Sequence, residues 1–377
     1  MIHFFNPGYE TEILNASKHY CSPAPVRKMQ SDLSSLPEWY GEENDITVSI
    51  KQLLSDKVED KNPEYKQNEQ VDFWGISPVA VHLVHKYSAA HNLNLHIPEW
   101  KDEYRYLGSR FASRDVLAAI IDEIPEIDKI ILPVFFSNME DIKKVGNLSL
   151  IKSPYSSSGR GLVWLPDGKP GQSERQIIDG MLKRQGQVSC ERALDRRLDL
   201  SMHFTVQSKD CTRFIGYSIF YTNTRGIYEK SVLANQNSLE QQIMKYIDKH
   251  LLEQVKDSLI KQLNKIYSSS YQGSIGVDML VYFDGATHRL HPCIEINMRK
   301  SMGYLAIRFM EKHVHRNSHG FFAVDYFKNP IDLHNSHLEM QKKHPLQTVA
   351  GKLSSGYKSL CSVTEETNYR AYVMILS

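Results

Sequence analysis

Two stretches in the C-terminal third of the chain decide the fold: Val277-Asp278-Met279-Leu280 and Glu295-Ile296-Asn297-Met298-Arg299. Each has the composition of a β-strand, and the turn residues Asp284-Gly285 lie between them, which predicts a hairpin. Glu295 and Asn297 are two residues apart, so in a strand both side chains point to the same face. The hairpin would gather two carboxylates and an amide oxygen, the ligands that Mg²⁺ prefers.

A solvated sheet face is the competing interpretation of Asp278, because polar residues on one side of a hairpin usually face water. However, residues 275–283 are largely apolar on both sides, as in a buried sheet. A carboxylate inside such a strand costs free energy unless it is paired or ligated, which favours a site. Arg299 would lie on the face of Asn297, where it could meet a phosphate.

The bulk composition is that of an ordinary globular protein. The chain has 377 residues, of which 41% are hydrophobic and 24% charged, and its net charge is +1. That length predicts two or three domains, and the balanced charge gives no support for a nucleic-acid or anionic-membrane partner. The five cysteines are scattered without a C-x-x-C pair. They favour free thiols in a reducing, cytoplasmic setting. We expect neither a signal peptide nor a membrane-spanning helix.

The order of expected elements indicates an α/β protein. Strands and helices alternate over the first hundred residues, which predicts a small open α/β domain. Ser77 followed by Pro78 predicts the start of a helix. Residues 129–136 read as a strand interrupted by Pro133, and 200–206, 213–222 and 227–232 as an antiparallel meander. Apolar residues recur every four positions over 238–268, which predicts one long helix packed on a sheet.

A lysine followed by a hydroxyl- and glycine-rich loop is the second candidate feature. Lys152 ends an expected strand, and Ser156, Ser157, Ser158 and Gly159 follow before the next strand. Such a loop can place backbone N–H groups and hydroxyls around phosphates, with the lysine pairing a phosphate. It is not a P-loop, because G-x-x-x-x-G-K-[ST] is absent. A flexible hairpin turn with one exposed lysine remains the alternative.

The third feature is Glu191-Arg192-Ala193-Leu194, with Asp199 beyond it. A strand edge beside carboxylates could bind an adenine amino group and ribose hydroxyls. Taken by itself, this segment favours a solvated charged loop.

These features in this order resemble the ATP-grasp superfamily over roughly residues 107–304. The resemblance implies an α/β (α+β) fold, in which two α+β subdomains clamp the nucleotide behind a small open α/β N-terminal domain. It divides the chain into an N-terminal domain over 1–106, an ATP-grasp domain over 107–310 and a C-terminal extension over 311–377 that packs on the grasp domain.

The resemblance also implies roles for individual residues. Lys152 would contact the phosphates beneath a mobile loop of Ser156, Ser157, Ser158 and Gly159. Glu191 and the backbone near Ala193 would hold adenine, and Asp199 would hold the ribose. Asp278, Glu295 and Asn297 would ligate Mg²⁺, and Arg299 would steady the transferred phosphoryl group. Arg110 stands where the family usually has a lysine, and Asp199 sits one place later than the simplest spacing gives.

The implied activity is an ATP- and Mg²⁺-dependent ligase. It would activate the carboxylate of a small molecule or peptide as an acyl phosphate for attack by an amine or thiol. A kinase on the same scaffold and a non-catalytic ATP-binding module are the alternatives. The expected partners are ATP, the carboxylate substrate, the amine acceptor and a second copy of the chain in a homodimer, with neither nucleic acid nor membrane.

Overall fold

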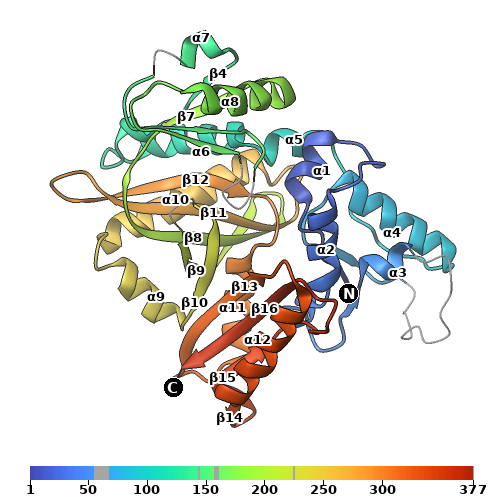
Figure 1. Ribbon diagram of the computed structural model, residues 1–377. Coiled ribbons are helices and arrows are strands. Elements are labelled where there is room, and N and C mark those ends of the chain that lie inside the picture. Colours follow the sequence, from blue (N-terminus) through green and yellow to red (C-terminus); the bar gives the residue numbers. More distant parts are fainter. Residues whose placement is uncertain (55–67, 143–144, 157–160, 224–225, 377) are drawn as a thin grey trace. The chain divides into compact units, whose positions relative to one another are not determined.

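The computed structural model describes residues 1–54, 68–142, 145–156, 161–223 and 226–376. The chain folds into two compact units (Figure 1). Unit 1 contains Met1–Asp102, Lys230–Asn235 and Arg299–Ser377, and unit 2 contains Glu103–Glu229 and Gln236–Met298. The N-terminal segment thus shares a unit with the C-terminal one, although about two hundred residues separate them in sequence. The predicted division into three consecutive domains, 1–106, 107–310 and 311–377, stays a prediction.

Unit 1 combines a parallel and an antiparallel sheet. Its N-terminal elements are β1 (Ile2–Phe4), α1 (Tyr9–Asn15), α2 (Ala24–Asp32), the 3-10 helix η1 (Leu36–Trp39), β2 (Ile46–Val48), α3 (Ile50–Leu54), β3 (Val71–Phe73) and α4 (Pro78–Ala90). Later come β10 (Tyr228–Leu233), α11 (Met302–His313), β13 (His319–Tyr326), α12 (Pro330–Lys343), β14 (Gln347–Val349), β15 (Lys352–Ser359) and β16 (Tyr369–Leu376).

The parallel sheet has the strand order β2-β1-β3, which confirms the α/β character predicted for the first hundred residues. Ser77 caps α4 as expected, because its side chain accepts a hydrogen bond from the amide of Ala80. The other strands of unit 1 follow the order β10-β13-β16-β15-β14. Asp32, at the end of α2, accepts from the amides of Asn368 and Tyr369, so the two ends of the chain are joined in one unit.

Unit 2 contains the remaining elements. They are α5 (Tyr104–Leu107), α6 (Arg110–Glu123), the 3-10 helix η2 (Lys129–Ile131), β4 (Val134–Phe136), α7 (Met139–Ile142), β5 (Ser149–Lys152), β6 (Leu162–Leu165), α8 (Gln172–Gln185), β7 (Val188–Arg192), β8 (Asp195–Ser208), β9 (Cys211–Thr222), α9 (Gln236–Ile243), α10 (Lys249–Ile266), β11 (Gly273–Phe283) and β12 (His288–Asn297).

Two antiparallel sheets form the frame of unit 2. The smaller has the order β4-β7-β5-β6, and the larger has, within this unit, the order β12-β11-β8-β9. Helices α6 and α10 pack on the larger sheet (Figure 1), and the apolar face of α10, with Val255, Leu259 and Leu263, is fully buried there. Only two residues separate the end of β7 from the start of β8, so the chain passes directly from one sheet to the other at residues 193–194.

The predicted hairpin is confirmed as β11 and β12, in which Asp278 lies opposite Glu295 and Gly276 opposite Asn297. The register slips beyond Asp278, since the next paired residue, Leu280, faces His291. Pro292 lies inside the slip and has no N–H to donate to a ladder. β12 ends the order of the larger sheet, and an edge strand tolerates such a residue.

Two expectations about helices and strands were wrong. The run over 238–268 is not one helix but α9 and α10, because Asp248 caps the second helix by accepting from the amide of His250. Periodicity alone could not reveal that break, since the apolar residues keep their spacing across it. Residues 129–136 form η2 followed by β4 rather than one strand, with Pro133 at the junction.

Among the residues that the structure describes, no helix is both long enough and apolar enough to cross a membrane.

Candidate functional site

A cavity of about 800 Å³ in unit 2 brings the predicted nucleotide residues together. Its lining comes from both sheets and from the segment that joins them. The predicted residues in the lining are Lys152, Glu191, Ala193, Asp199 and Asp278. Most of the remaining wall is apolar, with Leu150, Leu162, Trp164, Phe220, Ile227, Met279, Leu280 and Ile294 among its members. Apolar walls with a few convergent charged groups are typical of a small-molecule site.

A buried ion pair occupies one side of this cavity. Lys152, at the end of β5, pairs with Glu191 on the neighbouring strand β7, and both side chains are at least nine-tenths buried. Burial lowers the pKa of the Lys152 ammonium, although Glu191 opposes that shift. Burial also opposes ionisation of Glu191, but Lys152 and Arg110 outweigh it and hold the pKa of Glu191 below its ordinary value. The sequence predicted both residues but not that they would touch.

Asp199 lies inside β8 and also enters the cavity. Its carboxylate pairs with Arg196 and accepts a hydrogen bond of 3.1 Å from the hydroxyl of Thr222 on β9. Arg196 and Thr222 line the same cavity and are bonded to each other. The acid predicted to bind ribose is therefore already oriented by two neighbours from two strands.

The predicted metal ligands Asp278, Glu295 and Asn297 lie close together on the hairpin. Asp278 accepts a hydrogen bond of 2.5 Å from Ser201 on β8 and one of 3.0 Å from the amide nitrogen of Asn297. Since Asn297 donates through nitrogen, its amide oxygen is the atom suited to bind a cation. Within the described residues, no cluster of three His, Cys, Asp or Glu side chains is placed to hold a metal. The set here has two carboxylates and one amide, and its oxygen chemistry fits Mg²⁺.

Arg110 connects the metal-type hairpin with the loop after Lys152. It is the first residue of α6, buried, and its guanidinium donates to Glu295 at 2.8 Å and to the hydroxyl of Ser156 at 3.5 Å. It also donates to the backbone carbonyl of Ser153 at 3.2 Å. The guanidinium thus joins two of the predicted features, the hairpin and the loop after Lys152.

Other predicted residues are placed differently. The amide of Ala193 already donates to the carbonyl of Leu148 at 2.7 Å, so an adenine contact here would use other backbone atoms of this segment. Arg299 lies in unit 1, where its guanidinium donates to Glu10 at 2.6 Å and to the carbonyl of Lys300 at 3.0 Å. Ser157, Ser158 and Gly159 lie outside the described residues.

The sequence did not single out four polar residues of this region: Arg196, Ser201, Thr222 and His291. A period-2 count along β8 from Asp199 would have found Ser201 on the same face. No local signal marks Thr222 or His291, because each reaches the site only through strand pairing.

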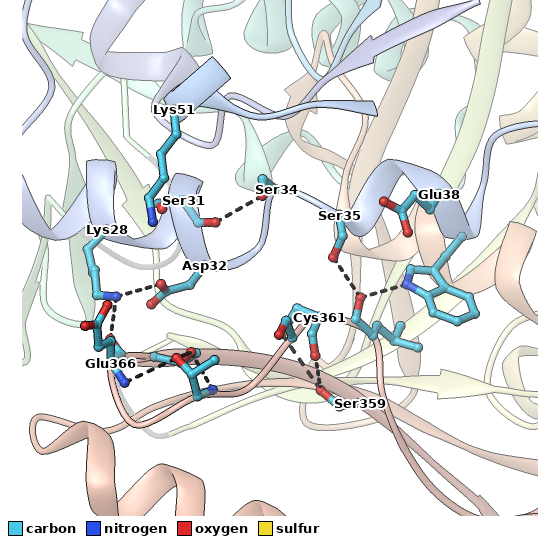
Figure 2. A pocket seen from close by; sticks show the side chains of 15 residues that line it. Lys28, Ser31, Asp32, Ser34, Ser35, Glu38, Lys51, Ser359, Cys361 and Glu366 are labelled. Atoms are coloured by element: carbon cyan, nitrogen blue, oxygen red, sulfur yellow. Dashed lines mark hydrogen bonds and ion pairs between the residues drawn. The ribbon is translucent and has the colours of Figure 1, made fainter. Parts of the chain in front are cut away.

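Unit 1 holds a second pocket, of about 510 Å³, between its N-terminal helices and the segment before β16 (Figure 2). Its hydroxyl-rich lining includes Ser31, Ser34, Ser35, Ser359, Ser362, Thr364 and Thr367. Many of these polar groups bind the protein itself. Ser35 and the Trp39 indole both donate to the carbonyl of Leu360, at 3.1 and 2.7 Å. Lys28 bonds both Asp32 and the carbonyl of Glu366 (Figure 2).

Comparison with solved structures identifies the fold. An N5-carboxyaminoimidazole synthetase from Staphylococcus aureus, complexed with ADP, matches with a TM-score of 0.50 at 12% identity, covering 100% of this chain and 93% of that one. A pyruvate carboxylase from Rhizobium etli matches with a TM-score of 0.50 at 10% identity, covering 82% of this chain and 28% of that one.

The likeness shows that the chain has the ATP-grasp fold, as the order of its motifs predicted. Neither a family model nor a curated protein sequence matches this chain. At these identities the likeness shows the fold alone.

Proposed function

We propose that this protein is an ATP- and Mg²⁺-dependent ligase that activates a carboxylate and joins it to an amine or thiol. The observation that carries the proposal is the cavity of unit 2. Four charged side chains from separate segments, Lys152, Glu191, Asp199 and Asp278, converge there among apolar walls. The synthetase solved with ADP has the same fold, which supports a nucleotide as the occupant.

The proposed roles are those that the resemblance to the ATP-grasp superfamily implies, and the positions of the charges support them. Lys152 neutralises phosphate charge, and Asp199, held by Arg196 and Thr222, accepts from ribose hydroxyls. Glu191 and the backbone near Ala193 would bind the adenine base. Asp278, Glu295 and Asn297 would hold Mg²⁺, which shields the phosphate oxygens and polarises the transferring group when it is bound. Arg110, fixed between Glu295 and Ser156, adds a guanidinium beside the loop after Lys152.

In the proposed reaction, a carboxylate oxygen of the substrate attacks the γ-phosphorus of ATP, and ADP leaves. The acyl phosphate is then attacked by the amine, which loses a proton as inorganic phosphate leaves with the bonding electrons. Positioning and neutralisation of charge are the main contributions of the protein. Arg299 would steady the transferred phosphoryl group.

The loops after β1 and β3 are the proposed acceptor region, since open parallel sheets bind ligands beyond the C-terminal ends of their strands. There the side chain of Asn6 clamps the backbone of Gly75 through two hydrogen bonds of 2.8 and 3.1 Å. Glu10, which follows the same loop, pairs with Arg299.

The test combines nucleotide binding with product analysis. Calorimetry with Mg²⁺ and a non-hydrolysable ATP analogue measures affinity, and pooled carboxylates and amines are screened for release of phosphate. We expect Glu295→Gln to lower Mg²⁺-dependent turnover by about 100-fold or more, since a metal contributes several kcal/mol to such a transition state. Glu339→Gln, at a surface pair with Lys343, is the matched control and should behave as wild type.

The product decides between activities. An amide or thioester with free phosphate supports the ligase, and a stable phosphoester would instead identify a kinase. Binding of ATP without turnover on any acceptor would identify a non-catalytic module, and unchanged turnover in Glu295→Gln would refute the metal assignment.

A further inference from the structure

His291 is a buried histidine in the wall of the unit 2 cavity, and the proposed reaction leaves it unused. Only 4% of the residue is exposed. Its Nδ1 atom is buried and has no hydrogen-bond partner in any other residue that the structure describes; the ring does contact the backbone of His291 itself. Buried polar groups are nearly always bonded in folded proteins, so an imidazole in a cavity wall that bonds no other residue indicates a ligand as its partner.

Strand pairing places His291 at the nucleoside end of the proposed site. His291 on β12 pairs with Leu280 on β11, and Leu280 pairs with Asp199 on β8. Residues paired directly across strands share a face of the sheet. The proposed metal ligands Glu295 and Asp278 form a separate row with Ser201. His291 therefore stands in the row of the proposed ribose ligand, and not in the row of the metal ligands.

Burial favours the neutral form of the His291 imidazole. Burial lowers the pKa of His291 to about 4, and Lys152 adds to that shift, whereas Glu191 opposes it. A neutral imidazole has one N–H donor and one acceptor nitrogen, which suits the polar edge of a nucleoside better than a phosphate. A half-turn of the ring exchanges the position of Nδ1 with that of a ring carbon, so either side of the ring can present a nitrogen to the cavity.

We propose that His291 recognises ATP through a direct hydrogen bond between its imidazole and the base or the ribose. The inference rests on the proposed nucleotide site and adds a specificity residue to it. In the absence of ligand, the unpartnered nitrogen destabilises the protein, and bound nucleotide removes that penalty. Replacing the ring by an apolar side chain should therefore weaken binding without destabilising the unliganded fold.

The matched pair of variants is His291→Leu and His203→Leu. His203 lies in the same sheet and is equally buried, but its ring is bonded to Ser218 at 3.0 Å and does not line the cavity. We expect His291→Leu to bind ATP about tenfold more weakly, with an unliganded melting temperature no lower than that of wild type. His203→Leu should melt lower and keep its ATP affinity. His291→Gln, which keeps a hydrogen-bonding group, should recover part of the affinity and serves if the leucine variant fails to fold.

Nucleotide analogues locate the bonded atom. Calorimetry of wild type and His291→Leu would use ATP analogues that each lack one group: N1, N3, N7, the 6-amino group, the 2′-hydroxyl or the 3′-hydroxyl. The penalty of the variant should vanish with one of them. An equal penalty with ATP and every analogue, an unchanged affinity for ATP, or a lower melting temperature with unchanged affinity would overturn the inference. Failure of wild type to bind ATP would instead refute the proposed function itself.

Discussion

The two pockets of the molecule differ in how their polar groups are satisfied. In unit 1, serine hydroxyls, the Trp39 indole and Lys28 bind carbonyls and carboxylates that tie the N-terminal helices to the segment before β16. In unit 2, charged groups are buried among apolar walls, and His291 keeps a nitrogen without a described partner. In the unit 1 pocket, these hydrogen bonds between parts of the protein stabilise the fold. The unit 2 arrangement keeps buried charge at a cavity, as a binding site requires.

The largest expected effect comes from breaking the buried pair of unit 2. Lys152→Met leaves Glu191 buried without its cation and should lower the free energy of unfolding by about 3–5 kcal/mol. The double variant Lys152→Met/Glu191→Gln also removes the unpaired charge of Glu191. It should therefore regain most of the lost unfolding free energy, while its ATP affinity stays low. Urea unfolding and calorimetry measure the two quantities. Recovery of ATP affinity in the double variant would contradict a role of Lys152 at the phosphates.

Asp72, on β3 of unit 1 and outside the unit 1 pocket, should make stability depend on pH rather than on nucleotide. Although burial opposes ionisation of Asp72, Lys300 and His3 outweigh it and lower its pKa from 3.8 to about 2. Its folded-state pKa is depressed, so its contribution is fully present above the unfolded value and is lost as pH falls from about 4 to about 2.

Between about pH 5 and about pH 2, Asp72 should account for about 2 kcal/mol of the lost unfolding free energy. Asp72→Asn should show a loss smaller by that amount. Equal pH dependence in both proteins would rule out this assignment.

Exchange of one tryptophan in each pocket should give opposite results. Trp39→Phe loses the bond to Leu360 and should lower the free energy of unfolding by about 1–2 kcal/mol without changing ATP affinity. Trp164 is 50% exposed at the cavity of unit 2. Trp164→Phe should change stability by less than about 0.5 kcal/mol but weaken ATP binding several-fold, because the smaller ring covers less of an apolar ligand face at the cavity. If both variants lowered stability, or both weakened ATP binding, the proposed difference between a structural pocket in unit 1 and a binding pocket in unit 2 would be wrong.

The smallest effect on stability is expected at the ion pair between Lys28 and Asp32 in the unit 1 pocket. The Lys28 side chain is 36% exposed beside Asp32, and such pairs contribute about 0–1 kcal/mol. Lys28→Met should therefore change stability far less than Lys152→Met and leave ATP affinity unaltered. A thermal melt in the presence and absence of Mg²⁺ and ATP tests both statements, and a loss comparable to that of Lys152→Met would show that exposure does not separate the two pairs.

The sequence by itself determined the elements that have a local signature. Asp278 and the Glu295–Asn297 pair on a turn-linked hairpin, Lys152 at a strand end and Ser77 as a helix cap all follow from period, turn residues and capping, and the structure has each where it was expected. The order of these features along the chain was also enough to predict the ATP-grasp fold. The break at Asp248 was missed because an apolar repeat can continue across two helices that pack on the same sheet.

Only the tertiary structure decided which distant residues share a site. The contacts of Lys152 with Glu191, Arg110 with Glu295 and Arg299 with Glu10 join residues 39, 185 and 289 positions apart. The orientation of Asp199 by Arg196 and Thr222, and the place of His291 in its row, depend on the register between strands. Register and sheet order result from the packing of whole faces, and no local window of sequence contains that information.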